Sequence, residues 1–296
     1  MPFVFGPAAA GPRPIADNWG PWPRAAGAPF CLRGPDFFSD SLFPMDLLIV
    51  TAASLLAGLV DSIVGGGGLI LIPALFATYP GAAPATLFGT NKSASVWGTS
   101  IATVQYARRV RLRWPVLGPA ALAAFVGSFF GAWVVTMIDP AFLRKLLPVI
   151  LLAVLLYTLT KKDLGRVHAP RHDGRRESLL ACGIGLVLGW YDGFFGPGTG
   201  SFFIFLFVRV LGYDFLNASA SAKVLNVATN ISAIALFAAK GHIWWQVGAV
   251  LAVANIAGSL IGTRLALKHG AGFVRWVFIV VVGALILKTG YDAFLK

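Results

Sequence analysis

Residues 58–68 read GLVDSIVGGGG, and residues 189–199 read GWYDGFFGPGT. Each stretch places an aspartate shortly before a glycine-rich interruption of a long apolar segment. Inside a helix, glycine costs about 1 kcal/mol relative to alanine and proline about 3 kcal/mol, so neither stretch sustains a regular helix. The sequence therefore predicts that the chain unwinds at two places, once in each half.

The similarity between the two halves extends without a gap from 58 to 158, and its counterpart begins at 189. The matching residues are ones that apolar segments rarely share by chance: Gly58 with Gly189, Asp61 with Asp192, Gly65 with Gly196, Gly67 with Gly198, Lys92 with Lys223, Trp114 with Trp245, and Arg144 with Arg275. We predict two homologous repeats, 45–160 and 178–296, joined by a basic cytoplasmic loop at 161–177. Duplicated halves with intramembrane charges and glycine breaks are typical of secondary transporters.

The composition predicts an integral membrane protein. Of the 296 residues, 57% are hydrophobic and only 12% are charged, whereas soluble domains have about 25% charged residues. The mean hydropathy is +0.77. A soluble α/β core would need short apolar runs broken by polar faces, but 115–138 and 146–160 are apolar on every side.

The net charge of +12 does not indicate nucleic-acid binding, because the basic residues gather in short connections. These residues are Arg108, Arg109, Arg111 and Arg113, then Lys161, Lys162, Arg166, Arg171, Arg175 and Arg176. Loops rich in Lys and Arg stay on the cytoplasmic side of a membrane. We expect a lipid bilayer as partner and no nucleic acid.

The sequence predicts no metal, no cofactor and no enzymatic activity. Cys31 falls in a tail and Cys182 in a span, so neither a disulfide framework nor a thiolate cluster is available. The sole glutamate, Glu177, is expected in the central loop. All four histidines are expected in loops or at span ends: His168, His172, His242 and His269.

Residues 1–44 are rich in proline, glycine and alanine, and they lack the continuous apolar core of a signal peptide. We expect a disordered tail. Because Met45 directly precedes the first apolar run, the alternative is that translation begins there. The sequence leaves both starts open, and N-terminal sequencing would decide between them.

The fold class expected is an all-α integral membrane protein. Apolar segments fall at 46–64, 69–79, 84–106, 115–138 and 142–160, and then at 178–195, 199–211, 217–238, 246–267 and 273–294. The segments 69–79 and 199–211 are shorter than the roughly 20 residues that a crossing helix needs. We predict about eight transmembrane helices plus two half-helices after the Gly-rich breaks.

The orientation of the halves depends on the half-helices. If they turn back, there are eight spans and both halves point the same way. If they cross, there are ten spans and the halves are inverted. The basic residues of the second half do not decide, and length alone favours eight.

The two breaks predict the binding site, because unwound backbone at membrane depth is tolerated only against protein or a water-filled cavity. The start of a half-helix also offers free N–H groups and a partial positive charge, which favour an anion. The residues expected to bind substrate at the breaks are Gly66, Gly67 and Gly68, then Gly198, Thr199, Gly200 and Ser201.

Asp61 and Asp192 are the only carboxylates expected clearly inside spans. An ionised aspartate at the bilayer centre costs at least about 2.5 kcal/mol, so each should face protein or water. Two roles stay open for them. They accept hydrogen bonds from the glycine loops and fix their shape, or they couple transport to a proton or another cation.

Lys92 and Lys223 lie at equivalent depths in the third segment of each half, too deep for easy snorkelling. An anion would use both ammonium groups, or each lysine would pair with an aspartate, and both readings stay open. Further hydrogen-bonding side chains near the breaks come from Asn91, Ser93, Asn226 and Asn230.

Two segments, 127–131 and 258–262, read GSFFG and GSLIG. Their small-xxx-small spacing predicts close helix packing in preference to ligand contact.

Three motifs carry a family resemblance: Asp61 to Gly68 followed by Pro73, Thr90-Asn91-Lys92, and Tyr191 to Gly200. Together they resemble the signatures of the TauE/SafE sulfite exporter family of permeases, over residues 46–294. The resemblance implies a multi-pass permease of the bacterial inner membrane that exports sulfite, organosulfonates or related small anions. The tail has no counterpart in it.

The sequence thus predicts a secondary transporter whose repeats move against each other around a midplane anion site. An importer or permease for a small carboxylate shares every feature used here and stays open. A non-transport membrane subunit would leave the paired intramembrane charges unexplained. Substrate, direction, coupling ion and oligomeric state are not fixed by the sequence.

Overall fold

The computed structural model describes residues 43–160 and 174–269, all within the unit Leu32–Lys296. The described elements are α1 (Phe43–Val64), α2 (Gly68–Thr78), α3 (Pro84–Ala107), α4 (Trp114–Val135), α5 (Pro140–Thr160), α6 (Gly174–Phe194), α7 (Thr199–Leu206), the π-helical turn η1 (Phe207–Leu211), α8 (Phe215–Ala239) and α9 (Trp245–His269). The expectations for the tail, the loop at 161–173, the last span at 273–294 and Arg275 lie outside the described residues.

The all-α membrane fold is confirmed, since the described residues form helices and no strand. Four described helices are long and apolar enough to cross a membrane: Met45–Val64, Trp114–Val135, Phe215–Ala239 and Trp245–Lys268. The total of eight spans stays a prediction. One boundary differs clearly, because α6 begins at Gly174 and takes in Glu177, which was expected in the loop.

Both predicted breaks are present, and glycine backbone geometry causes them. Gly65 ends α1 with a φ of +76°, and Gly196 follows α6 with a φ of +91°. L-residues with a side chain rarely adopt this left-handed region, whereas glycine does so freely. The short helices α2 and α7, 11 and 8 residues long, begin just beyond the two breaks.

Helix α2 turns back along α1 after the first break. A Cβ atom placed on Gly67 would lie 2.7 Å from the carbonyl oxygen of Ala57, so the start of α2 is beside the middle of α1. Elsewhere the sequence marks helix starts in the usual way. Pro84 opens α3, and the Asp214 carboxylate accepts a hydrogen bond from the Asn217 backbone N–H at 2.6 Å to cap α8.

Glycines allow two pairs of helices to pack almost backbone to backbone. A Cβ on Gly127 of α4 would lie 2.2 Å from the Leu186 carbonyl oxygen of α6. A Cβ on Gly258 of α9 would lie 1.9 Å from the Leu55 carbonyl oxygen of α1. Neither site has room for any side chain, so the predicted close packing of these segments is confirmed.

Hydrogen bonds between the halves also occur in equivalent pairs. The Ser128 hydroxyl of α4 donates to the Thr229 carbonyl oxygen of α8 at 2.8 Å. The Ser259 hydroxyl of α9 donates to the Gly98 carbonyl oxygen of α3 at 2.7 Å. Ser128 and Ser259 are matched residues of the internal similarity, and so are Gly98 and Thr229.

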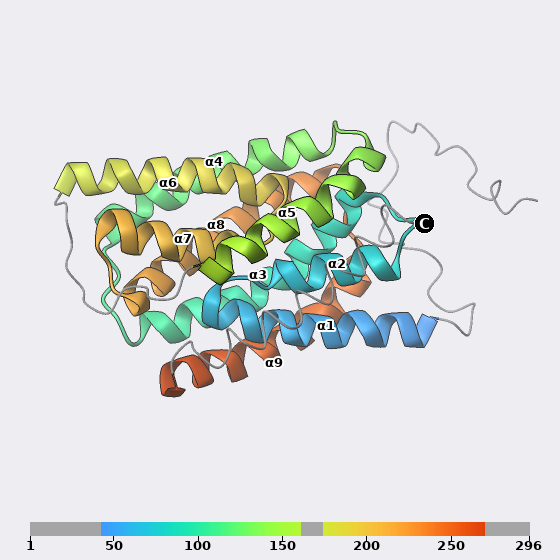
Figure 1. Ribbon diagram of the computed structural model, residues 1–296, viewed down its shortest axis with the longest axis horizontal. Helices are drawn as coiled ribbons and strands as arrows, with labels where there is room; N and C mark the ends of the chain where they lie inside the picture. Colours follow the sequence, from blue (N-terminus) through green and yellow to red (C-terminus); the bar gives the residue numbers. More distant parts are fainter. Residues whose placement is uncertain (1–42, 161–173, 270–296) are drawn as a thin grey trace, which may run out of the picture. The chain divides into compact units, whose positions relative to one another are not determined.

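The two halves run in opposite senses. In Figure 1, α1 begins at one end of the helical bundle and α6, its counterpart, begins at the other. The sequence associated opposite senses with short helices that cross, but here α2 turns back. A short helix that turns back is compatible with halves of opposite sense. After α2, the chain has returned towards the side where α1 begins, so α1 and α2 together make no net crossing.

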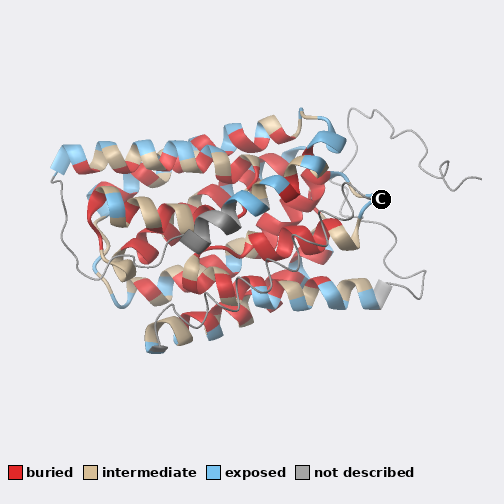
Figure 2. Ribbon diagram, in the orientation of Figure 1, coloured by how far each residue is buried: buried red, intermediate tan, exposed pale blue. Residues whose placement is uncertain are grey.

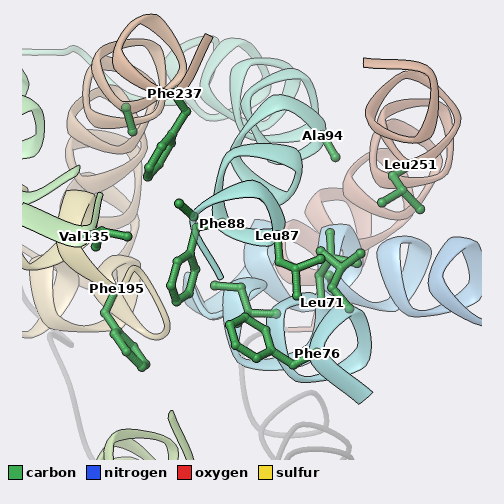
Figure 3. Packing of buried hydrophobic residues seen from close by; sticks show 14 of the residues in the cluster. Leu71, Phe76, Leu87, Phe88, Ala94, Val135, Phe195, Phe237 and Leu251 are labelled. Carbon is green, nitrogen blue, oxygen red and sulfur yellow. The ribbon is translucent and has the colours of Figure 1, made fainter. Parts of the chain in front are cut away.

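The buried residues, red in Figure 2, concentrate in the interior of the described bundle, and many of them are apolar. Figure 3 places Leu71 and Phe76 of α2 against Leu87 and Phe88 of α3, next to Phe195 at the second break. Large apolar side chains are also exposed on the outer helices: Leu122, Leu179, Val187 and Val253 are 66 to 70% exposed. In a soluble protein such surface would be a liability, whereas in a bilayer it faces lipid.

A buried ionic cluster joins the starts of α4, α6 and α8. Glu177 is fully buried, and its Oε1 accepts from Arg113 Nη1 at 2.9 Å and from the Tyr213 hydroxyl at 2.5 Å. Burial, followed by the hydrogen bond to Glu177, raises the pKa of Tyr213. The cluster ties together three elements that adjoin the second break.

Candidate functional site

The two chain breaks meet at the centre of the described bundle. A Cβ on Gly65 would lie 2.6 Å from the Gly200 carbonyl carbon, so the two glycines touch through their backbones. The Ser201 backbone N–H donates to the Gly65 carbonyl oxygen at 2.9 Å, and the Ser201 hydroxyl donates to Val64 at 2.7 Å. The freed backbone groups of one break are thus satisfied by the other.

A polar cavity of about 30 Å³ lies between the breaks. Its walls come from the end of α1, the start of α2, α3, the end of α6, the start of α7 and α8. The lining residues are Asp61, Gly65, Gly66, Gly67, Gly68, Asn91, Lys92, Ser95, Thr99, Asp192, Gly196, Gly198, Thr199, Gly200, Asn226 and Asn230.

Most residues expected at the site from the sequence line this cavity, but three do not. Ser93 donates to the Thr90 carbonyl oxygen at 2.8 Å and packs against Gly248 of α9. Ser201 binds the backbone of the first break, and Lys223 lies behind the cavity wall.

Lys92 and Asp192 form an ion pair at the cavity. Lys92 Nζ lies 2.5 Å from Asp192 Oδ2, and the two side chains are 5% and 7% exposed. A Cβ on Gly196 would lie 3.3 Å from that ammonium nitrogen, so the absence of a side chain there leaves room for the pair. The reading of the lysine as an ion-pair partner therefore describes Lys92.

The equivalent pair in the other half is built differently. Lys223 Nζ donates to the Asp61 backbone carbonyl oxygen at 2.7 Å and sits 5.6 Å from the centre of the Tyr106 ring. The Asp61 carboxylate accepts at 3.2 Å from the Gly67 backbone N–H and at 3.1 Å from the Thr99 hydroxyl. Asp61 therefore fixes the shape of the first glycine loop.

Four lining residues were not among those expected to bind substrate: Gly65, Ser95, Thr99 and Gly196. All four occupy matched positions of the internal similarity, in which Gly65 corresponds to Gly196. Ser95 is the counterpart of Asn226, and Thr99 is the counterpart of Asn230. The cavity is thus lined at equivalent places by two hydroxyls from α3 and two amides from α8.

Two buried amides at the cavity are only partly satisfied by protein. The side-chain oxygens of Asn91 and Asn226 have no hydrogen-bond partner among the described residues. An unsatisfied buried polar group costs about 1–3 kcal/mol. Both residues line the cavity, so its walls suit a polar occupant better than an apolar one.

The described residues contain no group of three or more histidine, cysteine, aspartate or glutamate side chains suited to holding a metal ion. What the lining offers instead is one ammonium group, two carboxylates, amide and hydroxyl groups, and the starts of α2 and α7. These starts carry the positive ends of two helix dipoles, while the N–H groups of Gly67, Thr199 and Ser201 already donate to acceptors within the breaks. Such a site can bind a small anion by charge and hydrogen bonding.

Comparison with known proteins identifies relatives over nearly the whole described chain. The family model of the sulfite exporter TauE/SafE matches residues 50–289. The probable membrane transporter protein YfcA of Escherichia coli K12 is 37% identical over 260 residues, covering 86% of this chain and 94% of YfcA. The probable membrane transporter protein ORF9 of a Sinorhizobium species is 35% identical over 242 residues, covering 82% and 91% of the two chains. No solved structure matches the chain.

Proposed function

Because the chain belongs to the sulfite exporter TauE/SafE family of membrane transporters, we propose that it is a secondary permease for a small anion. The substrate class is sulfite, an organosulfonate or a related anion, and the direction is export. The observation that carries the proposal is the Lys92 ammonium at a polar cavity between two helix starts. We place the protein in the inner membrane, as a transporter and not an enzyme.

The cavity supports binding of an anion by three means. Lys92 supplies a positive charge inside the bundle, where an ammonium group is costly unless it has a function or a partner. The starts of α2 and α7 supply the positive ends of two helix dipoles. Ser95, Thr99 and the two asparagines of α8 supply neutral hydrogen bonds around the ligand.

The arrangement of the halves supports alternating access. The hairpin of α1 and α2 and the hairpin of α6 and α7 enter from opposite ends and touch at Gly65 and Gly200. Equivalent hydrogen bonds also join the halves to each other, from Ser128 to Thr229 and from Ser259 to Gly98. In transporters built from inverted repeats, one repeat rocks against the other around a central site, and we assign this motion to the repeats 45–160 and 178–296.

The test is counterflow in proteoliposomes that contain only this protein. Vesicles preloaded with unlabelled sulfite, methanesulfonate or acetate are diluted into the same labelled anion. We expect uptake of sulfite and methanesulfonate. Uptake of acetate alone would indicate a small carboxylate as the substrate instead of sulfite or a sulfonate. The absence of uptake for every anion would refute the transport proposal.

Two lysine variants make the test specific to the site. Lys92→Ala should abolish uptake, because it removes the only ammonium group that lines the cavity in the part of the chain that the structure describes. Lys268→Ala is the matched control, since Lys268 is exposed near the end of α9. Equal uptake by Lys92→Ala and wild type would remove the anion role of this lysine.

A further inference from the structure

The two matched aspartates have different environments, and we infer that Asp192 takes up a proton when the anion binds, while Asp61 is a fixed structural group. This inference rests on the proposed transport function and assigns a coupling ion and a coupling residue to the same site. From the sequence, Asp61 and Asp192 were equivalent.

Both carboxylate oxygens of Asp61 accept hydrogen bonds from the protein. Oδ1 accepts from the Gly67 backbone N–H, and Oδ2 accepts from the Thr99 hydroxyl. Both donors favour the ionised carboxylate. A proton on Asp61 would face one of these two donor hydrogens, and the hydrogen bond that holds the first glycine loop would be lost. Asp61 is therefore poorly suited to gain and lose a proton during transport.

Asp192 is held by one partner that an anion can replace. Its Oδ2 accepts from Lys92 Nζ, and both side chains line the cavity. An anion that enters the cavity competes with the Asp192 carboxylate for the same ammonium group. A carboxylate displaced from its cation inside the bundle is stabilised by taking up a proton.

Charge balance gives the stoichiometry. The Lys92–Asp192 ion pair has no net charge. If one singly charged anion enters and Asp192 takes up one proton, the net charge is again zero. An uncompensated charge at this depth is costly, so the loaded and the empty site both reorient as neutral units. The protein therefore carries one proton in the same direction as each single negative charge of the substrate, so export follows the outward concentration gradient of the anion itself.

Other ionisable groups around Asp192 do not offer an alternative acceptor. Tyr191, its neighbour on α6, donates its hydroxyl to the Pro197 carbonyl oxygen at 2.8 Å. The packed helices α4 and α7 carry no ionisable side chain, and η1 carries only Arg209. Within residues 43–160 and 174–269, the charged side chains near this centre on other elements are Lys92 on α3, Asp61 on α1 and Lys223 on α8.

The experiment uses methanesulfonate, whose single negative charge does not change between about pH 5 and 8. Since the proton binds together with the anion, affinity should rise as the pH falls, by at most about tenfold per pH unit for one proton. Wild-type vesicles with an inwardly directed proton gradient should accumulate methanesulfonate above its external concentration. A membrane potential at constant pH should leave this uptake unchanged, because the loaded site is neutral.

Asp192→Asn and Asp61→Asn form a matched pair of variants. Asp192→Asn should lose both the pH dependence of uptake and the accumulation driven by the proton gradient. Asp61→Asn should lower the yield of folded protein through the loss of the loop contacts, and the protein that remains should keep the wild-type pH dependence. Wild-type pH dependence in Asp192→Asn would overturn the inference while leaving anion transport intact.

A second measurement needs no variant. Purified wild-type protein in weakly buffered detergent solution should take up about one proton for each methanesulfonate bound, as reported by a pH indicator dye. Binding without proton uptake would overturn the inference. Failure of methanesulfonate and sulfite both to bind and to be transported would instead overturn the proposed function, so the two failures are distinguishable.

Discussion

Matched residues do different work in the two halves. Lys92 reaches the carboxylate of Asp192, whereas Lys223 reaches a backbone oxygen and an aromatic ring. The internal similarity placed each lysine near a break, but it could not say which oxygen either would contact. That choice depends on side-chain geometry between helices far apart in the chain, which no local pattern records.

The lysines should therefore differ when truncated. Both Lys92→Ala and Lys223→Ala should abolish anion flux in proteoliposomes. Lys92→Ala should lower thermal stability more than Lys223→Ala, because it leaves the buried Asp192 carboxylate without its cation, whereas Lys223→Ala removes one donor from the Asp61 carbonyl oxygen. Flux and melting temperature should be measured on the same preparations, and equal stability of the two variants would contradict the distinction.

Gly65 should not accept any side chain. Gly65→Ala forces a φ of +76° on an L-residue and drives its Cβ into the backbone of Gly200. The conformational strain alone costs about 1–2 kcal/mol, and the clash adds to it. We expect a large loss of folded protein, measured by monodispersity in size-exclusion chromatography.

Gly81→Ala is the control for Gly65→Ala. Gly81 has an ordinary negative φ, and a Cβ there would meet nothing within 4 Å. Its yield and elution profile should match wild type. A well-folded Gly65→Ala protein would show that the two breaks are not in contact.

At the scale of helices, hydrophobicity and glycine breaks were enough to place the elements. The short helices start next to the glycine runs, because those runs fix where the preceding helix must stop. The start of α6 was missed, because its first turn is charged and apolar periodicity does not reveal it. Burial of Glu177 explains why this polar turn is part of the fold.

Helix pairs that touch through glycine should be the most sensitive to added volume. Gly127→Val and Gly258→Val each insert a side chain where a Cβ would already be within 2.2 Å and 1.9 Å of a carbonyl oxygen. Both should lower the melting temperature markedly and by similar amounts, since overpacking costs typically about 1–3 kcal/mol. Gly183→Val on α6, where a Cβ meets nothing within 4 Å, should change it little.

The ionic cluster at Glu177 should also stabilise the packing of α4, α6 and α8. Glu177→Gln leaves Arg113 without its carboxylate partner and replaces the acceptor of the Tyr213 hydroxyl. We expect a lower melting temperature, because removing one member of a buried ion pair is destabilising. Arg113→Ala should be more severe, since it leaves the fully buried Glu177 carboxylate without its cation, whereas Arg113 in Glu177→Gln is 40% exposed and its charge is solvated. A larger loss for Glu177→Gln would contradict this ranking.

For the whole molecule, the opposite senses of α1 and α6 were the feature that the sequence could not decide. The distribution of basic residues did not show how the two halves are oriented. The count of spans based on segment length assumed that the chain has crossed the membrane once α1 ends. The structure combines a short helix that turns back with halves that run in opposite senses.

Site-specific labelling tests this relation in a membrane. Met45→Cys at the start of α1 and Arg175→Cys at the start of α6, each in the full chain with Cys31 and Cys182 replaced by serine, put one exposed thiol at each start. An impermeant maleimide should label the two variants from opposite sides, measured in right-side-out and inverted vesicles. Labelling from the same side would contradict opposite senses of the halves.

The contact between Gly65 and Gly200 has a mechanical consequence. Because no side chain separates the two hairpin tips, they cannot approach further, and the hydrogen bond from Ser201 to Gly65 resists their separation. In the proposed rocking motion, the tips would be a fulcrum whose position stays constant while the outer ends of the hairpins swing. A transported anion would pass beside this fulcrum, and its cross-section would be limited by backbone that no rotamer change can move aside.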